Sequence, residues 1–349
     1  MRGPGFEQAY GSTVGRAKLA LSSLEPLDCR TERGAEAAAR VLELARTRHY
    51  DCVWYATART AVPLGHLPLP SILDGDDFSF MRNYQLLRSS SWYGAKIFDY
   101  MDVAKYWWLE RNLQRHHTVV LRCSEVDRRR FLAPNVEILP NGTIIPDHVD
   151  RRPMGRVLFV GDLGYAPNRH GLEWFLGSVW PRIRASNSDA SLDIVGRLPS
   201  DRIRSFGCQD GVHVHGFVDN LATLYESASL SIVPLLAGGG TRLKIIESLA
   251  RIVPVVSTEI GATGLEIPAG SGLDIANGAD AFAIACLKIL GQGAQADAAA
   301  VRGREYVARH YDWKLIQDKA MQLVARVSRR MPGRYVAPRV ALEGSSTEE

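Results

Sequence analysis

The sequence predicts an α/β protein of two domains, each built around a parallel sheet. Three observations indicate this class. Short apolar runs recur along the chain and alternate with helical patterns, as expected for strands joined by right-handed crossover helices. Most of these runs are nearly continuously apolar, as in strands that helices cover on both faces. The chain has 349 residues, which is enough for two separate cores.

The N-terminal half carries the weaker pattern. We expect strands at 52–55, 71–73, 118–121 and 136–139, and helices at 34–48, 100–115 and 125–132. Residues 1–33 contain no strand-like run, so the first strand–helix units are expected to be missing, replaced or encoded upstream of the assigned start. The N-terminal domain is therefore expected to be incomplete, with few strands and an exposed sheet edge.

The C-terminal half alternates more clearly. We expect strands at 156–160, 192–195, 212–214, 230–233 and 254–257, and a helix at 168–184. The turn and polar residues from 140 to 153 read as a linker, so we expect domains at 1–145 and 146–330. Residues 331–349 are rich in Pro, Gly, Ser and Glu, which predicts a disordered tail. In parallel sheets, ligands bind outside the carboxyl ends of the strands.

Composition excludes several classes of protein. The net charge of +4 argues against a general nucleic-acid binder, which would concentrate basic residues on one face. The five cysteines are odd in number, widely spaced and lack a C-x-x-C, so reduced thiols are expected rather than disulfides or zinc ligands. No apolar run reaches the roughly 18 residues of a membrane span, and no signal peptide is recognised, so we expect a cytoplasmic protein.

A glycine-rich turn in the C-terminal half carries the chemistry. The apolar run 230–233 leads into Gly238, Gly239 and Gly240, and a helix then opens with Thr241, Arg242, Lys244 and Glu247. Glycines allow close backbone approach, and the first helical turn presents unpaired N–H groups and a positive dipole end. Thr241 is a candidate N-cap. Cations there oppose the dipole unless an anion, above all a phosphate, lies in front of them.

One face of that helix carries both a cation and a carboxylate. Lys244 and Glu247 are three residues apart, as suits a diphosphate beside a hydroxylated ring. The alternative is a Gly-rich turn before an ordinary surface helix. The turn does not fit a Walker A loop, because no Ser or Thr follows the lysine in that frame.

Several segments together resemble a known family. The matching pieces are residues 159–161, 193–197, 214–218, 238–250 and 254–258, with a fainter match at 123–127 and 140–142. In this order they resemble the nucleotide-sugar-binding domain of group 1 (family 4-like) retaining glycosyltransferases. The resemblance implies the GT-B fold, with two Rossmann-like domains. It also implies transfer of a sugar from a nucleotide-diphosphate donor with retention of configuration, with no cofactor and no obligatory metal.

The resemblance also implies roles for individual residues. Glu247 matches the second Glu of the family's Glu-x7-Glu motif and would bind the donor ribose. The first Glu falls on Gly239, so the chain resembles the branch that reads Gly-Gly-Gly-Thr-Arg-Leu-Lys instead. Arg242 and Lys244 are the catalytic candidates, and they would stabilise the leaving diphosphate. The other donor-side candidates are Gly238, Gly239, Gly240, Thr241, Gly161, Arg197, and Phe217 and Val218 at the nucleobase.

The acceptor side is less defined. Asp74-Gly75-Asp76-Asp77 contains an Asp-x-Asp that could bind a divalent cation. We favour Asp76 and Asp77 as acceptor-side groups instead, with no metal site. The acceptor is expected to be a glycan, a lipid-linked compound or a small molecule. The Trp107–Trp108 pair, with Trp92 and Tyr93, is interpreted as core; exposed aromatics beside Arg111 and Arg115 would instead suit contact with a membrane surface.

Two other functions compete with sugar transfer. A catalytically silent relative that binds nucleotide or acts as a scaffold is the alternative, because the N-terminal domain lacks expected elements. A dinucleotide-dependent oxidoreductase is disfavoured, because no G-x-G-x-x-G follows a strand.

Overall fold

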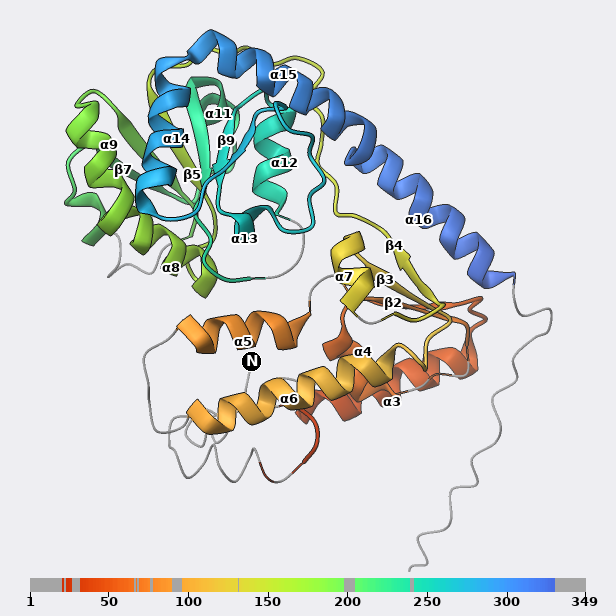
Figure 1. The fold of residues 1–349 in the computed structure, drawn as a ribbon. Helices are drawn as coiled ribbons and strands as arrows, with labels where there is room; N and C mark the ends of the chain where they lie inside the picture. The colour runs from red at the N-terminus through yellow and green to blue at the C-terminus, as the bar shows by residue number, and fades with distance from the viewer. Residues whose placement is uncertain are drawn as a thin grey trace, which may run out of the picture.

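The computed structural model describes residues 21, 23–26, 32–65, 67, 69–75, 78–89, 96–130, 132–197, 205–238 and 242–329. These residues form two α/β lobes (Figure 1). We call residues 32–138 and 313–328 the N-terminal lobe, which contains a four-stranded sheet. We call residues 156–310 the C-terminal lobe, which contains a six-stranded sheet. Every strand pair is parallel, so the predicted α/β class with two parallel sheets is confirmed.

The N-terminal sheet has the order β1-β2-β3-β4. Its strands are β1 (Val53–Tyr55), β2 (Ser71–Asp74), β3 (Val119–Arg122) and β4 (Val136–Ile138). Its first helices are α3 (Glu32–Thr47), α4 (Ala58–Leu64), α5 (Ser79–Ser89), α6 (Lys96–Leu113) and α7 (Glu125–Arg130). All four strands match their predicted positions to within a residue or so. Helices α4 and α5 were not predicted from the sequence, because neither has a long periodic pattern.

The C-terminal sheet has the order β10-β9-β8-β5-β6-β7. The strands are β5 (Arg156–Val160), β6 (Ser191–Val195), β7 (Val212–Gly216), β8 (Ala228–Val233), β9 (Val255–Ser257) and β10 (Leu273–Ile275). The chain runs outward from β5 to β7, then returns to place β8 on the other side of β5. The order of strands therefore reverses between β5 and β8, which is the position where doubly wound sheets bind ligands. The sequence did not predict β10.

Helices cover both faces of this sheet (Figure 1). They are α8 (Ala166–Trp174), α9 (Trp180–Ser186), α11 (Ala222–Ser227), α12 (Leu243–Ala250), α13 (Glu259–Ala262), α14 (Ala279–Gly291) and α15 (Gly293–His310). One face packs a cluster that includes Phe159, Phe175 and Phe282, all fully buried. The other face packs Ile245 and Leu249 of α12. Burial on both sides explains why the strands read as continuous apolar runs.

The single helix predicted at 168–184 is wrong in one respect. A π-helical segment, Phe175–Val179, separates α8 from α9. Pro181 lies in the first turn of α9. Proline has no N–H to donate to the preceding turn, so a continuous α-helix through this point would lose a hydrogen bond. The wider π turn accommodates this break.

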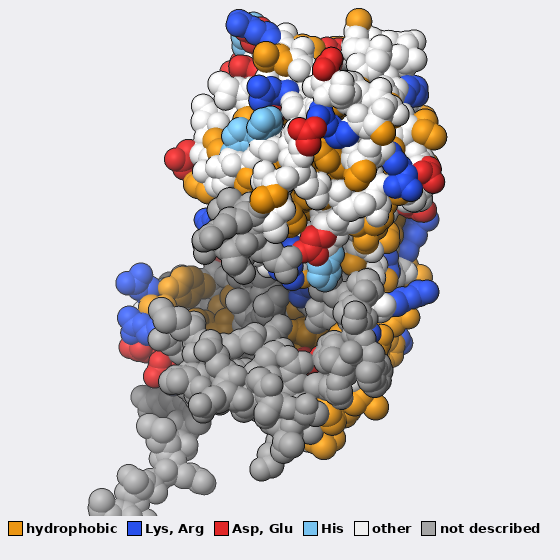
Figure 2. All heavy atoms as spheres, turned by 90° about the vertical axis from the view of Figure 1, so that its left-hand side faces the viewer, with side chains coloured by type: hydrophobic (Ala, Val, Ile, Leu, Met, Phe, Trp, Pro, Cys, Tyr) orange, Lys and Arg blue, Asp and Glu red, His pale blue; other side chains and the backbone are white. Residues whose placement is uncertain are grey.

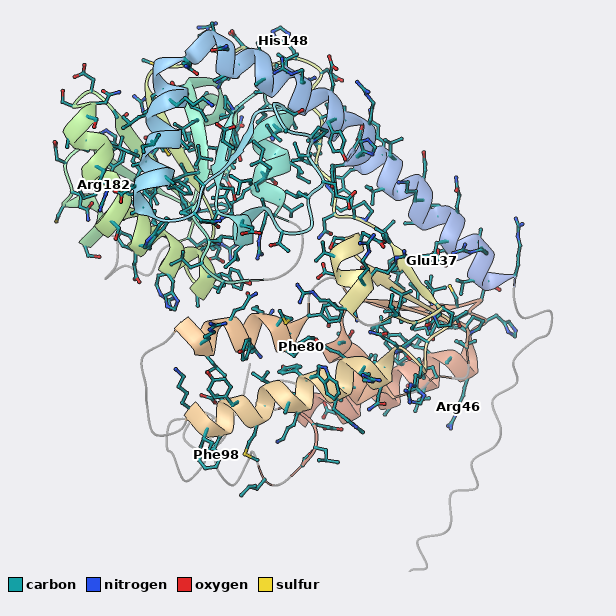
Figure 3. The ribbon with its side chains drawn as sticks, viewed as in Figure 1. Arg46, Phe80, Phe98, Glu137, His148 and Arg182 are labelled. Carbon is teal, nitrogen blue, oxygen red and sulfur yellow. The ribbon has the colours of Figure 1, made fainter. Side chains whose placement is uncertain are left out.

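The C-terminal helix α16 (Trp313–Ser328) returns to the N-terminal lobe (Figure 1). Leu323 and Val327 pack against Ile72, Val119 and Leu121 of the four-stranded sheet. Figure 3 shows Glu137 of β4 near α16, and its carboxylate accepts a hydrogen bond from Arg326 Nη2 at 2.6 Å. The sequence range 146–330 therefore includes one helix that packs on the opposite lobe.

The chain passes between the lobes twice, and the two crossings touch. Thr143 and Asp312 form an isolated parallel bridge. The Thr143 N–H donates to Tyr311 O at 2.7 Å, and the Trp313 N–H donates to Thr143 O at 3.1 Å. A Cβ on Gly142 would lie 2.9 Å from the Trp313 ring, so only glycine lets the first crossing lie flat on that ring. The two connections therefore run side by side.

Candidate functional site

The loops after β5 and β8 meet where the strand order of the C-terminal sheet reverses. Gly161 follows β5, and its N–H donates to Val195 O of β6 at 2.9 Å. Gly238 lies in the loop after β8, before α12 begins at Leu243. Both positions are at the carboxyl edge of the sheet, so backbone groups and the start of α12 face the same crevice.

Lys244, the second residue of α12, points into this junction. Its ammonium donates to Asn168 Oδ1 at 2.8 Å and lies 4.8 Å from the centre of the Phe159 ring. A Cβ on Gly161 would come within 3.0 Å of that ammonium. Part of the Lys244 side chain is exposed, yet burial of its charged end, followed by the charge of Arg242, lowers the pKa of Lys244 to about 7. Glu247 opposes this shift.

Arg242 immediately precedes α12 and is 8% exposed. Gly238 has a φ of +131°, and a Cβ there would lie 2.5 Å from Nη2 of Arg242. The glycine therefore lets the guanidinium lie against the backbone of the loop. Arg242 and Lys244 repel each other, as the lowered pKa of Lys244 indicates. An anion bound between them would relieve this repulsion.

The glycine loop also contacts the other lobe. The Gly238 N–H donates to Oε1 of Gln85, on α5, at 2.6 Å. One backbone donor of the predicted site is thus held by a side chain from across the crevice. Gln85 was not among the predicted site residues, because nothing in the sequence near α5 indicates a contact 153 positions along the chain.

Glu247 and Val218 lie close to the buried Tyr225. Burial raises the pKa of the Tyr225 phenol, and the nearby charge of Glu247 adds to this effect. Val218 packs against the cluster that contains Tyr225. Phe217 is 63% exposed, so it is not a core residue. The guanidinium of Arg197 lies 5.5 Å from the centre of the Phe217 ring.

Asn168 was also missed by the sequence analysis. It is 8% exposed and lies in the first turn of α8, opposite Lys244. The sequence did indicate this position. Asn168 is a polar residue that follows Pro167 shortly after the end of a strand, and residues there lie at the ligand-binding edge of a parallel sheet. Five predicted site residues lie outside the described residues: Gly239, Gly240, Thr241, Asp76 and Asp77.

A cavity of about 150 Å³ with several charged lining residues lies at the carboxyl edge of the N-terminal sheet. Asp74, Arg82, Glu110 and Arg122 contribute to its lining. Arg122 is buried, donates to Gly75 O at 2.5 Å and stacks on Phe78 at 3.8 Å from the ring centre. Glu110, also buried, accepts from the Ser79 N–H at 2.7 Å. Gly75, which precedes Asp76 in the sequence, therefore lies beside the buried charges of Arg122 and Glu110.

The core interpretation of Trp107 and Trp108 is wrong. They are 41% and 51% exposed on α6, and the Arg111 guanidinium lies 5.4 Å from the centre of the Trp107 ring. Figure 2 also shows hydrophobic side chains at the edge of the N-terminal lobe, in the lower half of the view. The buried hydrophobic side chains of α6 are those of Tyr106 and Leu109 instead. Trp92 and Tyr93 lie outside the described residues. In the part of the chain that is described, no helix is long and apolar enough to cross a membrane.

The C-terminal lobe is similar to known glycosyltransferases. Residues 155–292 match the family described as "Glycosyl transferases group 1". An uncharacterised 44.6 kDa protein in the cps region of Klebsiella pneumoniae is 32% identical over 135 residues, which cover 36% of this chain and 35% of that protein. A phosphatidyl-myo-inositol mannosyltransferase of Mycobacterium leprae is 26% identical over 185 residues, covering 49% and 46%. The chain thus spans less than half the length of these curated relatives.

Solved structures share the whole two-lobe fold. Sucrose-phosphate synthase from Thermosynechococcus elongatus has a TM-score of 0.67 at 17% identity, covering 86% of this chain and 80% of that one. Anabaena HepE in complex with UDP and glucose has a TM-score of 0.64 at 14% identity, covering 84% and 83%. The fold is therefore the GT-B fold of two Rossmann-like lobes, with a small N-terminal sheet of four strands in the residues described.

Proposed function

We propose that this chain is a glycosyltransferase that moves a sugar from a nucleotide-diphosphate donor to an acceptor with retention of configuration and without a metal. One observation carries the proposal. Lys244, Arg242, Gly161 and Gly238 converge at the point where the strand order reverses, inside the region that matches group 1 glycosyltransferases. This arrangement offers two cations and close backbone approach to one anionic ligand.

The chemistry asks the protein to stabilise a departing nucleoside diphosphate as its charge builds. Lys244 and Arg242 would do so as donors fixed in place before the reaction, which is the most effective form of such stabilisation. A charge-assisted hydrogen bond contributes about 1.5–3 kcal/mol. The dipole of α12 adds only about 0.3–1 kcal/mol. The two side chains would therefore supply most of the effect.

The rest of the donor would extend along the same edge. Glu247 would bind the ribose, while Phe217 and Val218 would flank the nucleobase with Arg197 stacked outside. Tyr225 supports this placement in part, because Val218 packs against its cluster and the charge of Glu247 acts on its phenol. Gly239, Gly240 and Thr241 would complete the loop around the diphosphate. HepE, which shares the fold, is described in complex with UDP and glucose.

The acceptor would enter from the N-terminal lobe. We propose Asp76 and Asp77 as acceptor-side groups, since Asp74 and Gly75, which precede them in the sequence, line a cavity at the strand ends. A glycan, a lipid-linked compound or a small molecule remains the acceptor class. Exposed Trp107 and Trp108 beside Arg111 would suit peripheral contact with a membrane that carries a lipid-linked acceptor. Sedimentation with vesicles of phosphatidylglycerol, compared with Trp107→Ala/Trp108→Ala, tests that contact.

The central experiment is a screen of UDP-, GDP- and ADP-sugars for binding, hydrolysis and transfer. Lys244→Ala is expected to lower turnover at least about tenfold, in line with the loss of one charge-assisted bond. Glu247→Ala is expected to weaken donor binding. Proton NMR of the anomeric centre of the product tests retention, and activity in EDTA tests independence from metals. Unaltered kinetics in both variants would contradict the assignment.

A catalytically silent nucleotide-binding or scaffold protein is the second candidate. The observation that favours it is the small N-terminal sheet, whose four strands form the acceptor side in the described part of the chain. Calorimetry that shows nucleoside diphosphate binding, with no hydrolysis or transfer from any donor, would support this candidate over the enzyme.

A further inference from the structure

Asn168 and Lys244 form a pair that the proposed function does not yet use. Asn168 is almost fully buried in the first turn of α8, whereas Lys244 lies on α12, 76 positions further along the chain. Their side chains meet at 2.8 Å between Asn168 Oδ1 and Lys244 Nζ. A buried lysine charge is costly to bring into the protein, so the partner that receives it matters.

The orientation of the Asn168 amide is fixed from both ends. Its Nδ2 donates to the backbone oxygen of Asp162 at 3.0 Å, in the loop after β5. This contact requires the amide nitrogen on that side, which leaves Oδ1 facing Lys244. A lysine ammonium only donates, so it requires an oxygen in that position. The two contacts therefore assign the same amide orientation independently.

Gly161 makes room for the pair. A Cβ at this position would lie 2.9 Å from Asn168 Nδ2 and 3.0 Å from Lys244 Nζ. The first distance requires the amide to shift and the second requires the ammonium to give by a few tenths of an ångström, so a larger residue at position 161 should disturb the contact. Gly161, which the resemblance assigns to donor binding, therefore also permits the contact between Asn168 and Lys244.

We infer that Asn168 is a positioning residue, which holds the Lys244 ammonium toward the diphosphate of the donor. The inference rests on the proposed function for the identity of that ligand. Asn168 accepts one of the three ammonium hydrogens and carries no charge, so the positive charge stays available for phosphate oxygens. An aspartate of the same shape would neutralise the charge.

Few other charges face Lys244 among the described residues. Arg242 and Glu247 lie on its own segment and act in opposite directions on it. β5 contributes the uncharged Phe159 ring. Asp162, in the loop after β5, accepts a hydrogen bond from the Gly164 N–H at 2.8 Å through its carboxylate. A charge placed at Asn168 should therefore dominate any change in the titration of Lys244.

The first experiment measures Lys244 itself and needs no activity. The full chain is treated with an amine-reactive reagent over a range of pH, and modification of the Lys244 peptide is quantified by mass spectrometry. In Asn168→Asp, the pH of half-maximal modification is expected to rise by about one to three units, because an adjacent opposite charge favours the ammonium. Asn187→Asp, beyond the C-terminal end of α9, is the matched control and should leave the profile unchanged.

The second experiment measures binding of UDP, GDP and ADP by calorimetry, with the matching nucleosides for comparison. Asn168→Ala and Gly161→Ala, confirmed as folded by circular dichroism, are expected to weaken diphosphate binding about tenfold, the equivalent of about 1.4 kcal/mol. Nucleoside binding should not change.

The outcomes separate the inference from the proposed function. Two outcomes overturn the inference: an Asn168→Asp profile for Lys244 that matches the wild type, or an Asn168→Ala variant that binds the diphosphates as tightly as the wild type does. A wild type that binds none of the three diphosphates overturns the proposed function and the diphosphate target with it. The modification profile would still decide whether Asn168 governs Lys244.

Discussion

The two lobes differ in where their cores come from. The C-terminal sheet is enclosed by helices of its own lobe, with Phe282 on one face and Leu249 on the other. The N-terminal sheet encloses one face with α3, α4 and α6, and takes its other cover from α16, the last helix described. The candidate diphosphate site lies wholly on the self-contained lobe, apart from Gln85. Substitutions that destabilise the N-terminal lobe should therefore leave donor binding intact. Substitutions in α16, near the C-terminal end of the chain, should in contrast destabilise the N-terminal lobe.

The largest expected effect tests the dependence of the N-terminal lobe on α16. Leu323 is buried against the four-stranded sheet, so Leu323→Ala should lower the free energy of unfolding of that lobe by about 2–5 kcal/mol. Differential scanning calorimetry should show an earlier transition for this lobe and an unchanged one for the C-terminal lobe. Met321→Ala, an exposed position on the same helix, should change little. One common shift of both transitions would contradict the division.

The next effect concerns the pH response of the self-contained lobe. The pKa of Lys244 in the folded chain is about 7, against an ordinary value of 10.5, so the unfolded state binds more protons between these values. Stability of the C-terminal lobe should therefore rise as the pH increases from about 7 to 10.5. Affinity for UDP, GDP or ADP should fall over the same range as Lys244 loses its charge. In Lys244→Met, both dependences should be lost from the melting and calorimetry profiles.

A smaller effect concerns the contact between the lobes. Gln85 holds the Gly238 N–H, a donor that a bound diphosphate would also use. Gln85→Ala should therefore tighten nucleoside diphosphate binding by up to about tenfold, given the roughly 0.5–1.5 kcal/mol of a net hydrogen bond. Arg88→Ala, exposed on the same helix, serves as the control for isothermal titration. Weaker binding in Gln85→Ala would instead mean that the ligand needs this contact.

The smallest effect lies at the outer end of α16. Arg326 and Glu137 form an exposed ion pair between α16 and β4. Exposed pairs contribute about 0.2–1 kcal/mol and are screened by salt. A double-mutant cycle with Arg326→Ala and Glu137→Ala should find a coupling energy in this range, which disappears in 1 M NaCl. A larger coupling energy that persists in salt would show that charge, and not the buried contacts of Leu323, attaches α16.

Strands such as β3, β8 and β9 could be predicted from the sequence because burial on both faces leaves a nearly continuous apolar run. β10, which was not predicted, offers only Leu273 and Ile275 around a central aspartate, and both lie at least partly exposed at the sheet edge. The helix pattern at 168–184 was recognised, but its π-helical break depends on how Pro181 meets the preceding turn.

Contacts between distant segments could not be predicted from the sequence in the same way. The glycine loop, Arg242 and Lys244 are adjacent in sequence, so their grouping was visible. Asn168 and Gln85 reach the same place only through the strand order and the packing of the lobes. The return of α16 has a similar cause, since an amphipathic helix does not specify which sheet it covers.

The paired crossings at Thr143 and Asp312 limit how the crevice can open. A single connection would let one lobe both swing and twist relative to the other. Two connections joined to each other, with Gly142 flat against Trp313, favour rotation about one line through that junction and resist torsion. Displacement at the contact between Gln85 and Gly238 then grows with distance from this axis, so a small rotation would be enough to break the hydrogen bond between them.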